Sequence, residues 1–351
     1  MNIVSLFSGC GGLDLGFSQA GFDVVWANEY DKTIHDTYLF NHSQTVLDKR
    51  DIRKISSSEI PGTSTSGDAC DGIIGGPPCT SWSSAGTRKG IEHPSGQLFH
   101  EYTRVVKDKQ PKFFLAENVR GILDTKNKEA FNNILSEFDS IGYNVSYKLL
   151  NANDYGVPQD RWRVIIVGIR KDLDVVYQFP EPHNPGLTLR DAIYDLKDET
   201  PSLMMSIKDT SHKTIPNHDY IVANYSSRFL SSNRVRGWDE PSYTIMATHG
   251  GSISLHPQSN KMILVTGRSA EQPTRVFAFD PDSLLYRRLS VRECARIQTF
   301  PDDFIFLYQK RRLEGVNVRN GYKMVGNSVP VNFARCLAES IMEVFNKKDT
   351  P

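Results

Sequence analysis

Residues 2–20, NIVSLFSGCGGLDLGFSQA, decide the fold class of this chain. The segment starts with an apolar run, Asn2–Phe7, that is typical of a buried strand, passes through a glycine-rich turn, and ends in a helical pattern over Leu13–Ala20. A strand that enters a helix through glycines brings backbone N–H groups and a helix N-terminus close to a ligand. The segment is a poor dinucleotide fingerprint, because Asp14 stands where the third glycine of Gly-x-Gly-x-x-Gly belongs.

The same alternation of short apolar runs and helical patterns continues to about residue 170. Such alternation predicts an α/β fold with a mostly parallel sheet covered on both faces, and ligands bind such sheets at the carboxyl ends of the strands. Ser56 and Glu59 have the spacing of a capping box that opens a short helix. Strands are predicted at Phe22–Ala27, Asp71–Gly75, Lys112–Glu117, Asn144–Leu150 and Arg163–Ile169, and helices at Asp31–Asn41, Gly96–Lys109 and Lys126–Ile141.

The regular alternation of strand and helix patterns ends after about Asp172, where the chain becomes rich in Pro, Ser, Asn and His and shows no clear period. Helical patterns return at Leu289–Ile297 and Asn332–Phe345. We therefore predict two domains: a larger α/β domain formed by residues 1–186 and 318–351, and a smaller domain of irregular or β structure formed by residues 187–317.

Composition limits the possible classes of protein. The 351 residues suit two domains, and no apolar run is long enough to span a membrane or to form a signal peptide. Five cysteines without paired spacing argue against a disulfide framework, and a zinc site is not expected. Lys plus Arg and Asp plus Glu both number 41, which is mild evidence against a nucleic-acid partner. Two basic stretches, Tyr286–Arg296 and Lys310–Lys323, suit either contact with phosphate or a solvated face.

The sharpest chemical signal is the segment Gly75–Ser83, GGPPCTSWS, which follows a predicted strand. Two prolines stiffen the backbone ahead of Cys79, which suits the presentation of a nucleophile. Methyltransferases of this fold that modify an exocyclic amine carry Asp or Asn, two prolines and an aromatic residue here. Carbon 5 of cytosine is not nucleophilic until a group adds at carbon 6, and a thiolate can make that addition.

Charged side chains stand at the ends of other predicted strands. Glu29 follows the second strand and can accept hydrogen bonds from a ribose, and Asp51 can interact with an adenine amine; ordinary solvent exposure is the alternative for both. Glu117 ends a buried strand, where a protonated carboxyl group can donate to N3 of a base. Arg161 and Arg163 alternate with period two, which suits contact with phosphate or the cytosine O2, or a surface salt bridge.

Together these motifs resemble the bacterial cytosine-C5 DNA methyltransferases of type II restriction–modification systems, across nearly the whole chain. Six segments stand in the family's order: Phe7–Phe17 (FSGCGGLDLGF), Gly76–Ser83 (GPPCTSWS), Glu117–Val119 (ENV), Gln159–Arg163 (QDRWR), Arg288–Phe300 (RLSVRECARIQTF) and Gly321–Pro330 (GYKMVGNSVP). Six motifs in order are far more specific than any one of them.

The resemblance implies a Rossmann-like fold that depends on S-adenosylmethionine, with the larger domain catalytic and residues 187–317 forming a target-recognition domain and hinge. It implies a methyl-donor pocket lined by Phe7, Gly9, Gly11, Leu13, Glu29, Tyr30, Asp51, Ile52, Pro78, Leu98, Asn327 and Val329. It implies that Cys79 is the nucleophile, with Glu117, Arg161 and Arg163 around the base, and that Arg234, Arg236 and Arg288 contact double-stranded DNA. The segment Gly321–Pro330 should fold back beside Phe7–Gly12.

The sequence departs from the usual family pattern at Thr80, where most members carry Gln, and at Cys10, where Ala or Gly is common. Residues Tyr225–Gln258 look most like enzymes that methylate GGCC sites, although the loop Thr248–Ser254 differs. A separate restriction endonuclease as partner, a monomeric state and a cytoplasmic location are further expectations. The alternatives are a tRNA cytosine methyltransferase, an NAD-dependent oxidoreductase, and a DNA-binding relative without activity.

Overall fold

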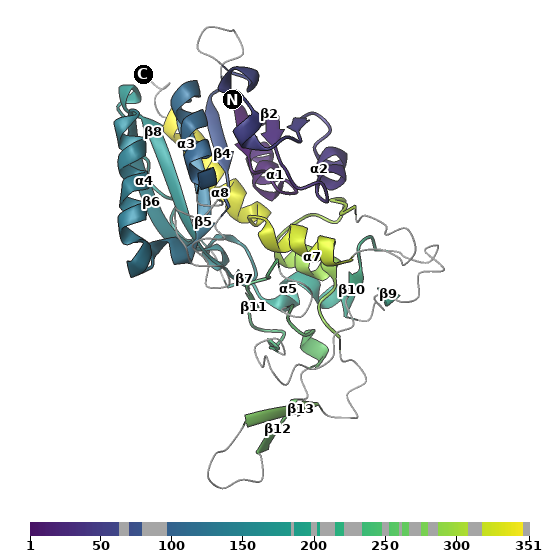
Figure 1. Ribbon diagram of the computed structural model, residues 1–351. Coiled ribbons are helices and arrows are strands. Elements are labelled where there is room, and N and C mark those ends of the chain that lie inside the picture. Colours follow the sequence, from purple (N-terminus) through teal and green to yellow (C-terminus); the bar gives the residue numbers. More distant parts are fainter. Residues whose placement is uncertain are drawn as a thin grey trace. The chain divides into compact units, whose positions relative to one another are not determined.

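A computed structural model describes residues 1–62, 70–78, 97–183, 186–197, 202–203, 215–220, 234–247, 253–259, 262–266, 275–279, 287–307 and 318–346. The chain divides into two compact units (Figure 1). Unit 1 comprises residues 1–157, 161–185 and 328–351, and unit 2 comprises residues 158–160 and 186–327. Within the described ranges, no helix has the length and apolar character needed to cross a bilayer.

Unit 1 is built on a seven-stranded sheet with the strand order β3-β2-β1-β4-β5-β8-β6. The strands are β1 (Asn2–Leu6), β2 (Asp23–Asn28), β3 (Val46–Asp48), β4 (Gly72–Gly75), β5 (Phe113–Val119), β6 (Tyr143–Asn151) and β8 (Trp162–Arg170). The strands from β3 to β5 run parallel, whereas β8 is antiparallel to both β5 and β6. This confirms the expected α/β fold, and the parallel strands bring their carboxyl ends to one edge of the sheet.

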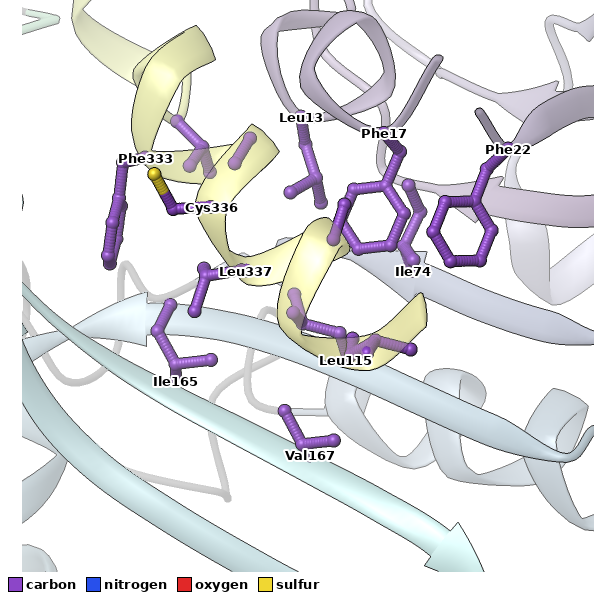
Figure 2. Close-up of a cluster of buried hydrophobic side chains, with 14 of the residues drawn as sticks. Leu13, Phe17, Phe22, Ile74, Leu115, Ile165, Val167, Phe333, Cys336 and Leu337 are labelled. Carbon is purple, nitrogen blue, oxygen red and sulfur yellow. The ribbon is translucent and has the colours of Figure 1, made fainter. Parts of the chain in front are cut away.

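Both faces of this sheet are buried. Successive side chains of a strand point to opposite faces, so a single strand contributes to the core on each side of the sheet. Phe113 and Leu115 of β5 join one apolar cluster with helices α1 (Gly12–Gln19) and α8 (Val331–Asn346), shown in Figure 2. Phe114 and Ala116 of the same strand join a second cluster, which includes side chains of α3 (Gln97–Lys109) and α4 (Lys128–Ser140). The near-continuous apolar runs of the sequence therefore mark central strands rather than one-sided ones.

The helices of unit 1 agree with the predicted patterns to within a few residues. They are α1 (Gly12–Gln19), α2 (His35–Asn41), α3 (Gln97–Lys109), α4 (Lys128–Ser140) and α8 (Val331–Asn346). The predicted capping box is confirmed, since Ser56 and Glu59 cap the 3-10 helix Ser57–Glu59 reciprocally. Helix α2 is shorter than expected, because its first turn begins only after the loop that follows Glu29.

Unit 2 contains short elements joined by irregular chain. Its helices are α5 (Leu189–Ile193), α6 (Val291–Ile297) and α7 (Val318–Asn327), and its strands are β7 (Gln159–Asp160), β9 (Ser202–Leu203), β10 (Asp219–Tyr220), β11 (Ser242–Tyr243), β12 (Met262–Thr266) and β13 (Arg275–Phe279). The strands form three pairs, β9 with β10, β7 with β11, and β12 with β13. Helix α7 was not predicted as a helix; it packs against α6.

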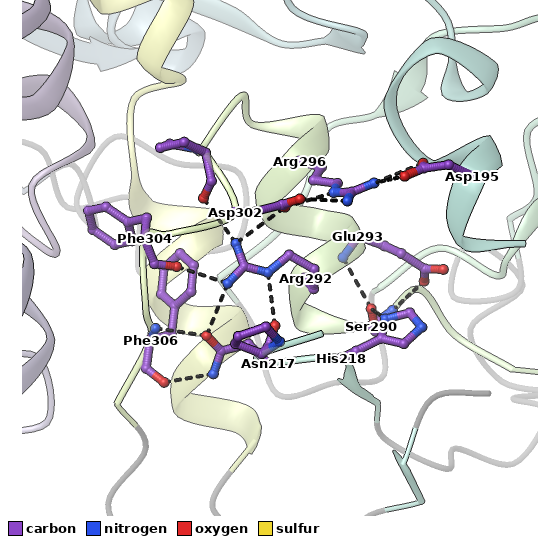
Figure 3. A network of polar contacts seen from close by, with 12 residues as sticks. Asp195, Asn217, His218, Ser290, Arg292, Glu293, Arg296, Asp302, Phe304 and Phe306 are labelled. Atoms are coloured by element: carbon purple, nitrogen blue, oxygen red, sulfur yellow. Dashed lines mark hydrogen bonds and ion pairs between the residues drawn. The ribbon is translucent and has the colours of Figure 1, made fainter. Parts of the chain in front are cut away.

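Three of the four arginines in the basic stretch around α6 are buried, so neither contact with phosphate nor a solvated face describes them. The fourth, Arg296, forms ion pairs with Asp195 and Asp302. Arg287, Arg288 and Arg292 are at most 5% exposed. Arg292 donates to the carbonyl oxygens of Pro216, Pro301 and Phe304, as Figure 3 shows in part. Arginine here stabilises unit 2 internally, because a planar guanidinium can satisfy several carbonyl groups that short irregular segments leave unpaired.

A buried acid and a buried imidazole lie within this network. Arg287 holds Glu293 through two hydrogen bonds of 2.7 and 2.8 Å. Burial opposes ionisation of Glu293, but the hydrogen bonds and charge of Arg287 outweigh it and lower the pKa of Glu293 to about 2. His256 Nε2 lies 3.5 Å from Glu293, yet burial lowers the pKa of His256 to about 4.

These pKa values predict that acid destabilises unit 2. The folded chain keeps His256 neutral, so between its ordinary pKa of 6.5 and the folded value of about 4 the unfolded chain binds a proton that the folded chain does not. Stability should fall through this window by up to about 3 kcal/mol. Urea midpoints followed by tryptophan fluorescence from pH 7 to 4.5 test this, and His256→Asn should flatten the dependence. An equal loss in both proteins would contradict the assignment.

Candidate active site

The glycine-rich turn between β1 and α1 lies at the carboxyl edge of the sheet in unit 1. Phe7, Gly9 and Gly11 all have positive φ angles, of 55°, 57° and 90°. A Cβ atom added to Gly9 would meet no described atom within 4 Å, so the space beside this residue is open. The N-cap residue of α1 is Gly11, which has no side chain that could cap the first turn. The turn thus presents backbone N–H groups toward open space, as an anion or a polar ligand requires.

Glu29 lies directly beside this turn, at the end of β2. Its carboxylate accepts the N–H of Gly9 at 2.9 Å and the N–H of Asp31 at 2.7 Å. Burial raises the pKa of Glu29, although the two N–H donors oppose the shift. The structure therefore brings together the glycine turn and the acid that the sequence singled out, and a carboxylate held by two amides retains lone pairs for ligand hydroxyl groups.

The other residues expected around the methyl donor occupy varied positions. Tyr30 is 65% exposed, while Ile52 is buried and begins a 3-10 helix that Asp51 caps. Asp51 also forms an ion pair with Arg53 at 2.5 Å. Leu13 packs in the apolar core, so only its backbone is available to a ligand. Leu98, in α3, packs against the second apolar cluster.

The described part of the nucleophile loop, Gly76–Pro78, is attached to the end of β5. Asn118 donates from Nδ2 to the carbonyl oxygen of Pro77 at 3.3 Å, and its own Oδ1 accepts the N–H of Val119. Glu117 Oε2 lies 3.3 Å from the position that a Cβ atom on Gly76 would take. The loop that leads into Cys79 therefore starts beside the Glu117 carboxylate. Cys79 and Thr80 themselves lie outside the described residues.

The two arginines of the QDRWR segment have different partners. Arg163 pairs with Glu117, with 2.6 Å between Nε and Oε1, and both side chains are 12% exposed. Arg161 is 1% exposed and donates to the carbonyl oxygen of Ser328 at 2.8 Å. Arg163 thus belongs to the Glu117 site, whereas Arg161 ties the segment to the chain just before α8. The expected surface salt bridge does not describe either residue.

The chain just before α8, from Ser328, returns to the glycine turn, as expected for the end of the segment Gly321–Pro330. Cys10 Sγ lies 3.0 Å from the hydroxyl oxygen of Ser328, although the two residues are far apart in sequence. Val329 is buried in the core of unit 1. Asn327, the last residue of α7, is exposed.

The three arginines expected to contact DNA lie in unit 2. The guanidinium groups of Arg234 and Arg236 both lie over the ring of Tyr243, at 4.5 and 4.2 Å from its centroid. Arg236 also pairs with Asp160 and Glu240. Arg288 is 1% exposed and donates to the carbonyl oxygen of Ile253. The expectation for Arg288 is therefore corrected: its guanidinium is buried inside unit 2 and bonded to a backbone carbonyl, so it is not exposed to a phosphate.

Sequence reasoning missed a group of buried polar residues behind the glycine turn. Asp14 is fully buried and accepts hydrogen bonds from Ser5 and Tyr38, both at 2.6 Å. His35, Tyr38 and His42 are also buried. Their spacing of i, i+3 and i+7 is the signal that could have shown one inward face of a helix.

Comparison with known proteins agrees with this geometry. The C-5 cytosine-specific DNA methylase family matches residues 1–343. This protein belongs to that family. The methylase is 48% identical over 353 residues to Type II methyltransferase M.FnuDI of Fusobacterium nucleatum, covering 99% of this chain and 96% of that protein. It is 50% identical over 342 residues to Type II methyltransferase M.MthTI of Methanothermobacter thermautotrophicus, covering 97% of each.

Solved structures support the fold of the methylase. The S. pombe Dnmt2 methyltransferase matches with a TM-score of 0.61 and 19% identity, covering 99% of both chains. The Entamoeba histolytica methyltransferase EhMeth matches with a TM-score of 0.66 and 16% identity, covering 98% of both chains. At these identities the likeness concerns the fold alone.

Methyltransferases of this family use S-adenosylmethionine, and the residues of unit 1 fit that molecule. The fit rests on the open space beside Gly9, the glycine N-cap of α1, and the buried Glu29 carboxylate, a set that matches a ligand carrying a carboxylate and ribose hydroxyls. In addition, the Ser8 hydroxyl is buried and has no hydrogen-bond partner among the described residues. A buried polar atom of this kind is expected to bind a ligand or water.

The attachment of the nucleophile loop by Asn118 can be tested. Asn118→Ala removes the donor to the buried Pro77 carbonyl, which should cost about 1–3 kcal/mol and loosen the loop. We expect methyl transfer to slow by about tenfold or more, measured with tritiated methyl donor and duplex DNA. Asn133→Ala, on the exposed side of α4, is the matched control and should keep the normal rate. Equal rates for both variants would show that the Asn118 contact has no role in the reaction.

Proposed function

We propose that this methylase is a sequence-specific DNA (cytosine-5-)-methyltransferase that modifies a cytosine extruded from double-stranded DNA. The observation that carries the proposal is the contact between the Gly76–Pro78 loop and the strand end Glu117–Asn118, at the carboxyl edge of a parallel sheet. Membership of the C-5 cytosine-specific DNA methylase family supports it. The pairing of a Pro-Pro-Cys loop with a neighbouring acid suits chemistry at a ring carbon rather than at an amine.

Cys79 is the nucleophile in this proposal. The target cytosine must leave the base stack, because carbon 6 is shielded inside a duplex. The Cys79 thiolate forms a bond from Sγ to carbon 6, and the electron pair of the ring double bond moves to carbon 5, which becomes nucleophilic. S-adenosylmethionine would supply the methyl group to that carbon, its bond from sulfur to the methyl carbon breaking to leave S-adenosylhomocysteine. A base then removes the carbon 5 proton, and the Cys79 bond to carbon 6 breaks to restore the aromatic ring and the thiolate.

Glu117 and Arg163 act on the base as one unit. A hydrogen bond from Glu117 to N3 withdraws electrons from the ring and makes carbon 6 more electrophilic. Arg163, 2.6 Å from Glu117 Oε1, holds the carboxyl group in place. Arg161 orders the same segment through Ser328, which supports its assignment to the catalytic site as a positioning residue.

The methyl donor is assigned to the glycine turn of unit 1. Glu29 accepts hydrogen bonds from the ribose, and Tyr30 and Ile52 flank the adenine, whose amine faces Asp51. Phe7, Gly9 and Gly11 shape the turn, and the backbone of Leu13 completes its exit into α1. Pro78, Leu98, Asn327 and Val329 are assigned to the remaining boundary of the pocket.

Sequence reading is assigned to unit 2. Arg234 and Arg236 are proposed to contact base edges in the major groove, where guanine accepts hydrogen bonds from arginine. Stacking on Tyr243 supports this role, because it restricts two flexible side chains before DNA binds. We further propose that the enzyme modifies a GGCC-like site and that this methylation blocks cleavage by a separate restriction endonuclease. It is also proposed to be monomeric and to act in the cytoplasm. Bisulfite sequencing of DNA from cells that express the protein will report the modified base and its context together.

The role of Cys79 predicts a trapped adduct. Duplex DNA with 5-fluorocytosine at the target cannot lose a proton from carbon 5, so the wild-type protein should remain bonded to it under denaturing conditions. Cys79→Ser should lower turnover more than about a thousandfold while leaving DNA affinity within about twofold. Cys336→Ser, which alters another cysteine of unit 1, should trap normally. Adduct formation by Cys79→Ser at wild-type yield would refute the role.

The role of Glu117 predicts a loss in rate without a loss in folding. Glu117→Gln should slow methyl transfer by about 10²–10⁴-fold, the usual contribution of an acid–base group, and leave the melting temperature nearly unchanged. A single-turnover assay with duplex DNA measures the chemical step. The same assay with tRNA separates the alternative substrate, since faster transfer to tRNA would assign the protein to RNA modification. A near-normal rate for Glu117→Gln would remove the N3 assignment.

A further inference from the structure

The inward face of α2 carries polar side chains, although apolar side chains would cost less free energy to bury there. His35, Tyr38 and His42 follow the i, i+3, i+7 spacing, with His42 as the residue that ends the helix, and they are 7%, 0% and 8% exposed. The outward-facing Leu39 and Phe40 are instead 38% and 59% exposed. Burying three polar side chains is costly unless their hydrogen bonds are satisfied, so their partners indicate what this face does.

The first of these partners belongs to the Glu29 half of the candidate pocket. The imidazole of His35 donates from Nε2 to the backbone carbonyl of Glu29 at 2.8 Å. The Glu29 carboxylate, at the other end of the same residue, accepts the N–H groups of Gly9 and Asp31. His35 therefore fixes the backbone from which the ribose-binding carboxylate extends.

The second set of partners belongs to the glycine-turn half. The ring of His42 lies against the backbone of the glycine turn, and its Nε2 is 2.0 Å from the position that a Cβ atom on Gly11 would take. The imidazole thus fills the space that this glycine leaves, and burial lowers the pKa of His42 and keeps it neutral. Tyr38 stacks on His42, with ring centroids 4.6 Å apart, and donates its hydroxyl to Asp14 of α1.

We infer that His35, Tyr38 and His42 are positioning residues for the methyl donor, since this one helix face holds both the Glu29 backbone and the glycine turn. The inference deepens the proposed function and rests on its assignment of the methyl donor to unit 1. None of the three side chains is assigned a direct contact with the donor. They hold the turn and the acid in the conformation that binds it, and such preorganisation contributes to affinity rather than to the chemical step.

The test measures binding of S-adenosylmethionine to the full chain by isothermal titration calorimetry, together with KM and kcat. His42→Leu should weaken binding by about tenfold, because it removes the imidazole that packs against the glycine turn, and raise KM for the donor equally. The value of kcat at saturating donor and the affinity for duplex DNA should stay within about twofold. Tyr38→Phe, which keeps the ring and its stacking, should weaken donor binding by about three- to tenfold. His42→Gln, which keeps a side-chain donor, should recover part of the affinity.

Phe40→Ala is the matched control on the outward face of α2 and should bind the donor normally. If His42→Leu fails to fold, Tyr38→Phe and His42→Gln carry the test. Normal donor affinity in Tyr38→Phe and His42→Leu would overturn the inference, as would equal losses of kcat and donor affinity, which indicate general damage. Failure of the wild-type protein to bind the donor would instead refute the proposed function, so the two failures are distinguishable.

Discussion

Burial of the central sheet on both faces is the constraint on which the rest of unit 1 depends. Strand β5 illustrates it: alternate side chains enter the apolar clusters below α1 and α8 and below α3 and α4. Because neither face can carry polar chemistry, functional groups are restricted to the strand ends. Parallel neighbours bring those ends to one edge, where Gly9, Glu29 and Gly76 follow three adjacent strands and Glu117 lies near the end of the next strand, β5.

Polar groups in this protein are buried where they hold backbone that regular structure cannot hold. In unit 1, Asn118 holds the Pro77 carbonyl and His42 holds the glycine turn, at places where the chain leaves the sheet. In unit 2, Arg292 and Arg288 do the same for irregular segments. The physical reason is shared: a buried carbonyl without a partner costs more than a buried side chain that satisfies it.

The two units therefore suit different tasks. Unit 1 presents a preorganised edge, with the Glu117–Arg163 pair and the glycine turn fixed by contacts on several sides. Unit 2 presents arginines stacked on Tyr243, supported by short strands and by a network of guanidinium groups rather than by a broad sheet. Rigid placement favours chemistry on one base, which is the task proposed for unit 1.

The amino-acid sequence by itself determined the alternation of strands and helices, the strand ends that carry chemistry, and the family, because periodicity and local motifs are properties of neighbouring residues. It did not predict that Arg288 and its neighbours are buried, since net charge in a segment says nothing about the carbonyl groups it will meet. Nor did it predict the pairing of Glu117 with Arg163 or the polar inner face of α2. The spacing of His35, Tyr38 and His42 could have indicated an inward helix face, but not the partners of that face. Glu117 and Arg163 are distant in the chain, as are Tyr38 and Asp14, and only the tertiary structure decides which strand ends and helix faces meet.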